Sequence, residues 1–144
     1  MKIVSLCGLL GYGYSEEALN IAFSEPVDYV GVDAGSTDPG PYYLGSGQSF
    51  TDRAAVKRDL ALAMPKALAH HAPLIIGTAG GAGARVHTNW LVEIIKEIAA
   101  EQNLSFRMGV VYSDVDKSYV LEKLENGKIL PMSETFQLTA QMVE

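Results

Sequence analysis

Short apolar segments alternate along this chain with longer amphipathic ones. Four apolar segments bounded by glycines or polar residues predict buried strands, at residues 3–7, 28–33, 73–77 and 106–112. Polar caps followed by helical spacing predict helices at residues 15–24, 51–70, 88–102 and 117–125. The expected caps are Ser15 for the first of these helices and Thr51 or Asp52 for the second. The tail from residue 133 also has a helical pattern. Pro65 falls inside the second of these helices, where we expect it to kink or split the helix.

Strands that alternate with helices predict an α/β fold. We expect a three-layer sandwich, with a mainly parallel sheet of about four strands and helices on both faces. No linker, repeat or low-complexity segment interrupts the pattern, so residues 1–144 are predicted to form a single domain. The long loop at residues 34–47 holds two tyrosines and two prolines, which favours an ordered loop.

Composition narrows the function classes. The chain has 144 residues, 48% hydrophobic and 19% charged, which excludes a disordered protein. A formal charge of −6 argues against nucleic acid as a partner, and the apolar runs are too short to predict a membrane span. Cys7 is the only cysteine and has no internal disulfide partner, so a reducing cytoplasmic location is expected.

Each predicted strand ends in a polar or glycine-rich loop, and ligands of open parallel sheets bind at the carboxyl ends of strands. The first loop has the pattern Gly8-x-x-Gly11-x-Gly13. The amides of Gly11 and Gly13 could bind a phosphate or carboxylate at the start of the next helix. A tight turn that binds no ligand would explain the same glycines. A nicotinamide cofactor is a weaker alternative, in which Asp33 would hydrogen-bond the ribose.

The second loop offers two carboxylates and a hydroxyl, from Asp33, Asp38 and Ser36. Burial can raise the pKa of a carboxyl group enough for acid–base catalysis, so both aspartates are candidate catalytic residues and Ser36 is a candidate ligand contact. Asp and Ser also stabilise ordinary turns, which is the simpler interpretation.

The third loop combines glycines with a cation and an imidazole. Its candidate catalytic residue is His87. Its candidate ligand-binding residues are Thr78, Gly80, Gly81, Gly83 and Arg85. A guanidinium holds a carboxylate or phosphate in a bidentate fork, and histidine transfers protons near neutral pH. A surface ion pair for Arg85 and a capping position for His87 are the alternatives.

The fourth loop contains Ser113, Asp114 and Asp116. Ser113 and Asp114 are candidate ligand contacts, and the carboxylates could bind Mg²⁺, although a helix N-cap at Asp116 or Ser113 is the simpler interpretation. No motif for a covalent cofactor is present, no metal site is assigned, and the identity of any cofactor stays open.

Several of these segments resemble the acyclic terpene utilisation (AtuA-like) family. They are Gly11-Tyr12-Gly13, the run Asp33-Ala34-Gly35-Ser36-Thr37-Asp38-Pro39-Gly40-Pro41-Tyr42-Tyr43-Leu44-Gly45-Ser46-Gly47, the run Gly77-Thr78-Ala79-Gly80-Gly81-Ala82-Gly83, and Ser113-Asp114-Val115-Asp116. The resemblance implies a bacterial cytoplasmic protein that takes part in the breakdown of branched terpenoid compounds through acyl-CoA intermediates. Family members are longer, so the resemblance also implies an N-terminal segment whose partner is the missing C-terminal region, or a second copy of the chain.

Two hypotheses of different classes follow. In the first, the chain is an enzyme domain that binds a small anionic organic acid or its CoA thioester, with hydratase- or lyase-type chemistry by Asp33, Asp38 or His87. In the second, the same loops form a non-catalytic ligand-binding or subunit-assembly module. An oxidoreductase that binds NAD is a weaker third.

Overall fold

The computed structural model describes residues 1–36, 39–131 and 136–143. Contacts divide the chain into two compact units, Met1–Ser113 and Asp114–Glu144. The first unit contains β1 (Ile3–Ser5), α1 (Glu16–Ala22), β2 (Tyr29–Asp33), α2 (Pro41–Ser46), α3 (Arg53–Ala69), β3 (Leu74–Gly77), the short 3₁₀ helix η1 (Ala79–Gly81) and α4 (Arg85–Glu101). The second contains α5 (Lys117–Glu125) and α6 (Ala140–Val143). In the described residues, no helix is both long and apolar enough to cross a bilayer.

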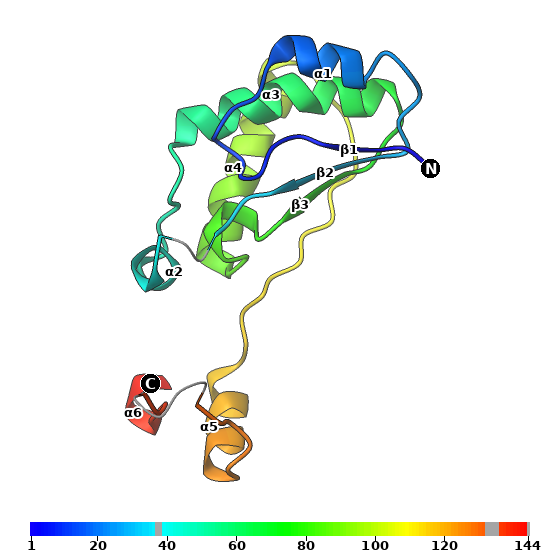
Figure 1. The fold of residues 1–144 in the computed structure, drawn as a ribbon. Coiled ribbons are helices and arrows are strands. Elements are labelled where there is room, and N and C mark those ends of the chain that lie inside the picture. Colours follow the sequence, from blue (N-terminus) through cyan, green and yellow to red (C-terminus); the bar gives the residue numbers. More distant parts are fainter. Residues whose placement is uncertain (37–38, 132–135, 144) are drawn as a thin grey trace. The chain divides into compact units, whose positions relative to one another are not determined.

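The sheet of the first unit is parallel and open, with strand order β1-β2-β3 (Figure 1). Val4 pairs with Val30 in the register of β1 and β2, and Val32 pairs with Ile76 in that of β2 and β3. The predicted α/β class and parallel pairing are therefore confirmed. The expectation of about four strands is not confirmed, because residues 106–112 are extended but have no strand partner in the described structure.

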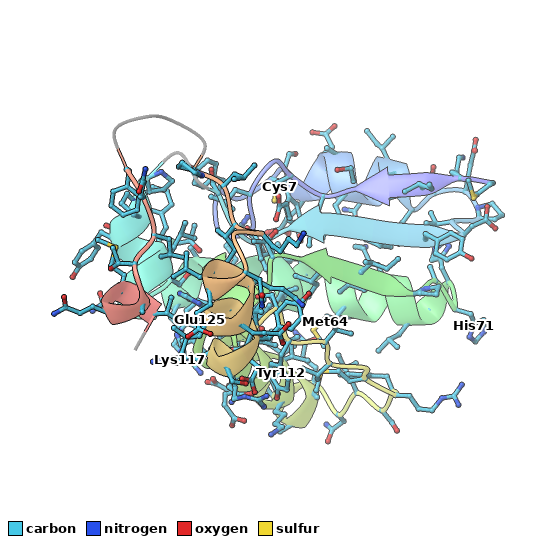
Figure 2. The ribbon with its side chains drawn as sticks, turned by 90° about the horizontal axis from the view of Figure 1, so that it is seen from below. Cys7, Met64, His71, Tyr112, Lys117 and Glu125 are labelled. Carbon is cyan, nitrogen blue, oxygen red and sulfur yellow. The ribbon has the colours of Figure 1, made fainter. Side chains whose placement is uncertain are left out.

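Helices cover one face of this sheet. Val4, Val30 and Val32 point to that face and join a single buried core with residues of α1, α3 and α4, among them Leu60 and Ile94. Seen from below in Figure 2, the three strands lie in front of α1 and α3. The predicted three-layer sandwich is likewise not confirmed.

The opposite face of the sheet carries exposed apolar side chains. Ile3 is 59% exposed, Tyr29 is 42% exposed and Ile75 is 58% exposed. Parallel sheets usually have both faces covered, so this exposed face is unusual. Its physical cause is the strand order. Strands added in one direction by crossovers of one hand place every connecting helix on the same side, and helices on both faces require the order to reverse.

Pro65 does not split α3, which runs continuously from Arg53 to Ala69. A proline in a helix cannot donate to the carbonyl four residues earlier, which here is that of Ala61. The side chain of Gln102, at the end of α4, donates a hydrogen bond of 3.2 Å to this carbonyl. A second helix therefore compensates for the bond that Pro65 removes.

Charged side chains also join α3 to α4. Lys57 lies 2.6 Å from carboxylate oxygens of both Glu97 and Glu101, and Arg53 lies 2.7 Å from Glu97. Hydrogen bonds from Lys57 and Arg53 lower the pKa of Glu97. Because these groups are solvated, the network contributes modestly and mainly fixes how the two helices align.

Several predicted helix ends are confirmed. Ser15 caps α1 and accepts a hydrogen bond from the amide of Ala18, and Asp52 caps α3 through the amides of Ala54 and Ala55. In the second unit, α5 covers the predicted residues 117–125 and is followed by Gly127 with φ +63°. The tail is helical only at α6 among its described residues. Inside the predicted loop at residues 34–47, the structure has the helix α2, which begins with Pro41.

Core burial predicts very different effects for two isoleucines. Ile94 has no exposed surface, so Ile94→Ala is expected to lower the free energy of unfolding by about 2–5 kcal/mol. Ile75→Ala, on the exposed face, is expected to change it by less than about 0.5 kcal/mol. Urea unfolding followed by circular dichroism measures both. Equal losses in the two variants would contradict the one-sided core.

Candidate functional site

The amides of the first glycine loop bind a carboxylate that belongs to the protein. The amides of Gly11 and Gly13 donate hydrogen bonds of 2.9 and 3.1 Å to one carboxylate oxygen of Asp59, in the middle of α3. The other oxygen lies 3.0 Å from the guanidinium of Arg58. Asp59 has no exposed surface. An external phosphate or carboxylate would have to displace this internal anion, so the loop's amides are already satisfied.

The Tyr14 hydroxyl and the Cys7 thiol lie near Asp59. The hydroxyl of Tyr14 donates a hydrogen bond to the backbone carbonyl of Asp59. Burial, together with the nearby charge of Asp59, raises the pKa of the Tyr14 hydroxyl and also that of the Cys7 thiol. Cys7 lies just past the carboxyl end of β1 (Figure 2) and is partly buried. Because a thiol with a raised pKa is less often ionised at neutral pH, Cys7 is a poor nucleophile.

The first loop lies against the start of the second, because the amide of Leu10 donates a hydrogen bond of 2.8 Å to the carbonyl of Asp33. The Asp33 side chain is exposed at the end of β2 and accepts a hydrogen bond of 3.2 Å from the amide of Gly35. This is the local turn that sequence reasoning gave as the simpler interpretation. Ser36 is half-buried, and Asp38 lies outside the described residues.

The second and third loops are in direct backbone contact. A Cβ atom on Gly35 would lie 2.1 Å from the carbonyl oxygen of Gly81 and 2.5 Å from a methyl group of Thr78. Gly80 has φ +74°, and a Cβ there would lie 2.1 Å from the carbonyl oxygen of His87. Only glycine permits these approaches. The glycines therefore let the loops and the start of α4 pack together.

His87 and Arg85 lie on the first turn of α4 in different surroundings. His87 is 1% exposed, and its Nε2 is 3.1 Å from the carbonyl oxygen of Tyr43 in α2. Its Nδ1 is buried without a hydrogen-bond partner in the described structure. The guanidinium of Arg85 stacks over the ring of Tyr112, 4.1 Å from its centroid. His87 therefore connects α2 to the third loop, and the Arg85 side chain packs on an aromatic ring.

Ser113 also contacts the third loop. Its amide donates a hydrogen bond of 2.9 Å to the carbonyl of Gly83, and its hydroxyl donates one of 2.8 Å to the carbonyl of Ala82. Asp114 belongs to the second unit. Asp116 is the N-cap of α5, and hydrogen bonds from Ser118 lower its carboxyl pKa, so the simpler interpretation is confirmed there. Within the described parts of the chain, no group of three or more acidic, histidine or cysteine side chains could hold a metal ion.

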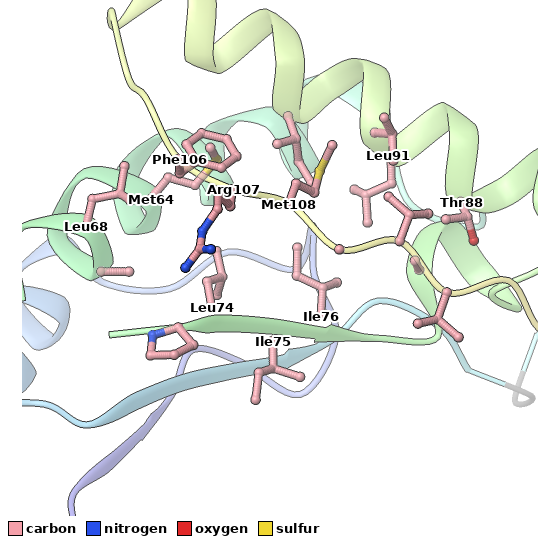
Figure 3. Close-up of a pocket in the computed structure, with 18 of the residues that line it drawn as sticks. Met64, Leu68, Leu74, Ile75, Ile76, Thr88, Leu91, Phe106, Arg107 and Met108 are labelled. Atoms are coloured by element: carbon pink, nitrogen blue, oxygen red, sulfur yellow. The ribbon is translucent and has the colours of Figure 1, made fainter. Parts of the chain in front are cut away.

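Sequence reasoning thus located loops that do gather at one end of the sheet, but an apolar groove of this unit lies elsewhere. A groove of about 450 Å³ runs along the free edge of β3, between that strand, α4 and the extended residues 106–111 (Figure 3). Its walls are mostly aliphatic, with Leu74, Ile76 and Leu91 among them. The side chain of Arg107 points into it (Figure 3). None of the candidate residues that the structure describes in the strand-end loops lines this groove.

Arg107 and Asp59 are the residues that sequence reasoning missed. The signal for Asp59 is an acid within the apolar spacing of Val56, Leu60 and Ala63 on one helix face. The signal for Arg107 is a cation inside an otherwise apolar extended segment.

Comparison of the chain with family models, with curated proteins and with solved structures found no match. The resemblance to the AtuA-like family therefore stays a prediction, and the function is argued from the geometry.

The Asp59 carboxylate is expected to be essential for stability. Asp59→Ala would leave the partly buried amides of Gly11 and Gly13 without their acceptor, which predicts a loss of about 1–3 kcal/mol in the free energy of unfolding. Asp52→Ala removes a carboxylate cap from the same helix and is expected to lose about 1 kcal/mol. Urea unfolding at neutral pH compares them. A loss at Asp59 no larger than at Asp52 would show that the loop does not depend on this carboxylate.

Proposed function

We propose that this chain binds a small organic acid with an aliphatic body, and that the groove beside β3 is the binding site. The observation that carries the proposal is an apolar groove into which the Arg107 side chain points (Figure 3). A volume of about 450 Å³ is within the range of small-molecule sites. Leu74, Ile76 and Leu91 would contact the hydrocarbon part of the ligand, and the guanidinium would bind its carboxylate.

Branched organic acids, as in the terpenoid catabolism that the resemblance implies, fit this chemistry. A CoA thioester is part of the same proposal, with its acyl chain in the groove. The proposal also includes a location in the bacterial cytoplasm, where Cys7 would stay reduced.

Binding is favoured over catalysis because the two candidate catalytic residues that the structure describes, Asp33 and His87, do not line the groove. Asp33 is exposed at the end of β2, and His87 is buried beneath the third loop. Hydratase- or lyase-type chemistry by Asp33, Asp38 or His87 therefore stays a prediction. So does a nicotinamide cofactor, although the amides of Gly11 and Gly13 are already bound to Asp59.

Octanoate is a suitable probe because it joins a flexible aliphatic chain to one carboxylate. We expect isothermal titration calorimetry to detect octanoate binding and Arg107→Gln to weaken it by about tenfold or more, since a charged hydrogen bond is lost. Neutral octanamide should bind the wild-type protein more weakly than octanoate does. Arg107→Lys should bind with intermediate affinity because it keeps the charge without the fork.

Lys96→Gln is the matched control for that experiment. It removes the same charge from the outer face of α4, where Lys96 is paired with Glu93 and does not line the groove. Its octanoate affinity should equal that of the wild type. If both variants bind octanoate equally weakly, the loss of affinity depends only on net charge and not on Arg107. If the wild type does not bind octanoate, the proposed site is wrong.

A subunit-assembly module is the second candidate, favoured by the exposed face of the sheet. Ile3, Tyr29 and Ile75 form an apolar surface there that a second copy or the family's C-terminal region could cover.

If this surface mediates self-assembly, the chain should sediment as a dimer at micromolar concentrations. Ile75→Asp should then yield a folded monomer, because a carboxylate would be buried without a partner at the contact. Analytical ultracentrifugation measures both states, with Val86→Asp, at an exposed valine of α4, as the control. A monomeric wild type would exclude self-assembly through this face.

A further inference from the structure

The free edge of β3 offers backbone groups to another strand. The amide of Val30 donates to the carbonyl of Pro73 (3.0 Å), and the amide of Ala34 donates to the carbonyl of Gly77 (2.9 Å), so odd-numbered positions of this strand face β2. Backbone groups of alternate residues point to opposite edges of a parallel strand. The amide and carbonyl groups of Leu74 and Ile76 therefore point away from β2. Such an edge is a template for strand pairing.

Residues 106–112 already run alongside this edge. Both segments line the same groove and extend in the same direction (Figure 3). The segment is held at both ends: the amide of Leu104 donates to the carbonyl of Ala99, and the amide of Ser113 donates to that of Gly83, each at 2.9 Å. Its chain direction and attachment suit a fourth parallel strand.

Three even-numbered side chains of this segment are less exposed than that of Val111, as expected if they lie on one face of a strand. Phe106, Met108 and Val110 are 36%, 40% and 38% exposed, whereas Val111 is 88% exposed. A period of two is the spacing of a strand whose one face is covered. The core side of the segment would therefore match the core side of β3, where Leu74 and Ile76 are partly buried.

The topology favours the same position. The order β1-β2-β3 proceeds in one direction, and α4 adds its buried residues to the core on the same face as α1 and α3. A further crossover of the same kind places the next strand beside β3. That neighbouring position is the one that residues 106–112 approach.

We propose that residues 106–112 dock on the free edge of β3 as a fourth parallel strand, and that docking closes the groove against its ligand. The closure of the groove rests on the proposed binding function, whereas docking itself does not. The docked strand and a bound organic acid would occupy the same space. Docking would therefore weaken the binding of the acid, and the bound acid would disfavour docking. The segment would act as a strap that must open for the acid to bind.

Hydrogen exchange of individual amides, measured by NMR on the full chain, tests the docking. A strand paired on one edge protects alternate amides, so we expect slow and fast exchange to alternate along residues 107–111, with the Leu74 and Ile76 amides of β3 also slowed. Uniformly fast exchange across the segment would overturn the proposal. Alternation that appears only where sedimentation shows a dimer would assign the edge to a second copy, which also overturns it.

Two neighbouring proline variants provide an independent test. In a docked strand, only one of two successive amides faces β3, so of Val110→Pro and Val111→Pro one should abolish the alternating protection and the other should keep it at the remaining positions. Each variant is the other's control for the general effect of proline. Equal effects, in variants whose circular dichroism shows the fold intact, would contradict strand pairing.

Octanoate addresses the closure separately. We expect saturating octanoate to speed exchange of the protected amides at residues 107–111, and the proline variant that loses protection to bind octanoate more tightly. If octanoate binds without changing exchange, the closure is wrong although the proposed function stands. If octanoate does not bind, the closure fails together with that function, and the docking is decided by the exchange pattern alone.

Discussion

The direction in which the strands are added governs the rest of this structure. Each strand after β1 joins on the same side of the previous one, so crossovers of one hand place all connecting helices on one face. The core therefore lies on one side of the sheet, and the other side exposes Ile3, Tyr29 and Ile75. A crevice at the strand ends normally forms where strand order reverses. No reversal occurs among the three strands, so the groove lies instead beside the last of them.

Local features of the chain could be predicted from the sequence because they depend on neighbouring residues. The caps at Ser15 and Asp52 and the bounds of α5 follow from side chains that satisfy adjacent backbone groups. The helix α2 was not predicted because it is short and lies in a glycine- and proline-rich segment. The strand order could not be predicted at all, since it depends on which edges meet in space.

The glycine-rich loops show where chemical interpretation of a sequence reaches its limit. Gly11 and Gly13 were predicted to expose amides to an anion, and their amides do bind one, but it is the carboxylate of Asp59, 46 residues further along the chain from Gly13. Gly80 was predicted to contact a ligand, and its backbone instead lies against that of His87. Gly35 likewise lies against the backbone of Gly81. The sequence shows that backbone must approach something closely in these loops. Whether that partner is a ligand or the protein itself depends on the tertiary structure.

Pro65 has an effect well beyond its own helix. By depriving the Ala61 carbonyl of its usual donor, it creates an acceptor that the end of α4 reaches through Gln102. The last turn of α4 is thereby held at a fixed height along α3, and the polypeptide leaves that turn a few residues before Phe106. A hydrogen bond that Pro65 removes from α3 thus helps to fix where the segment that returns alongside the sheet begins.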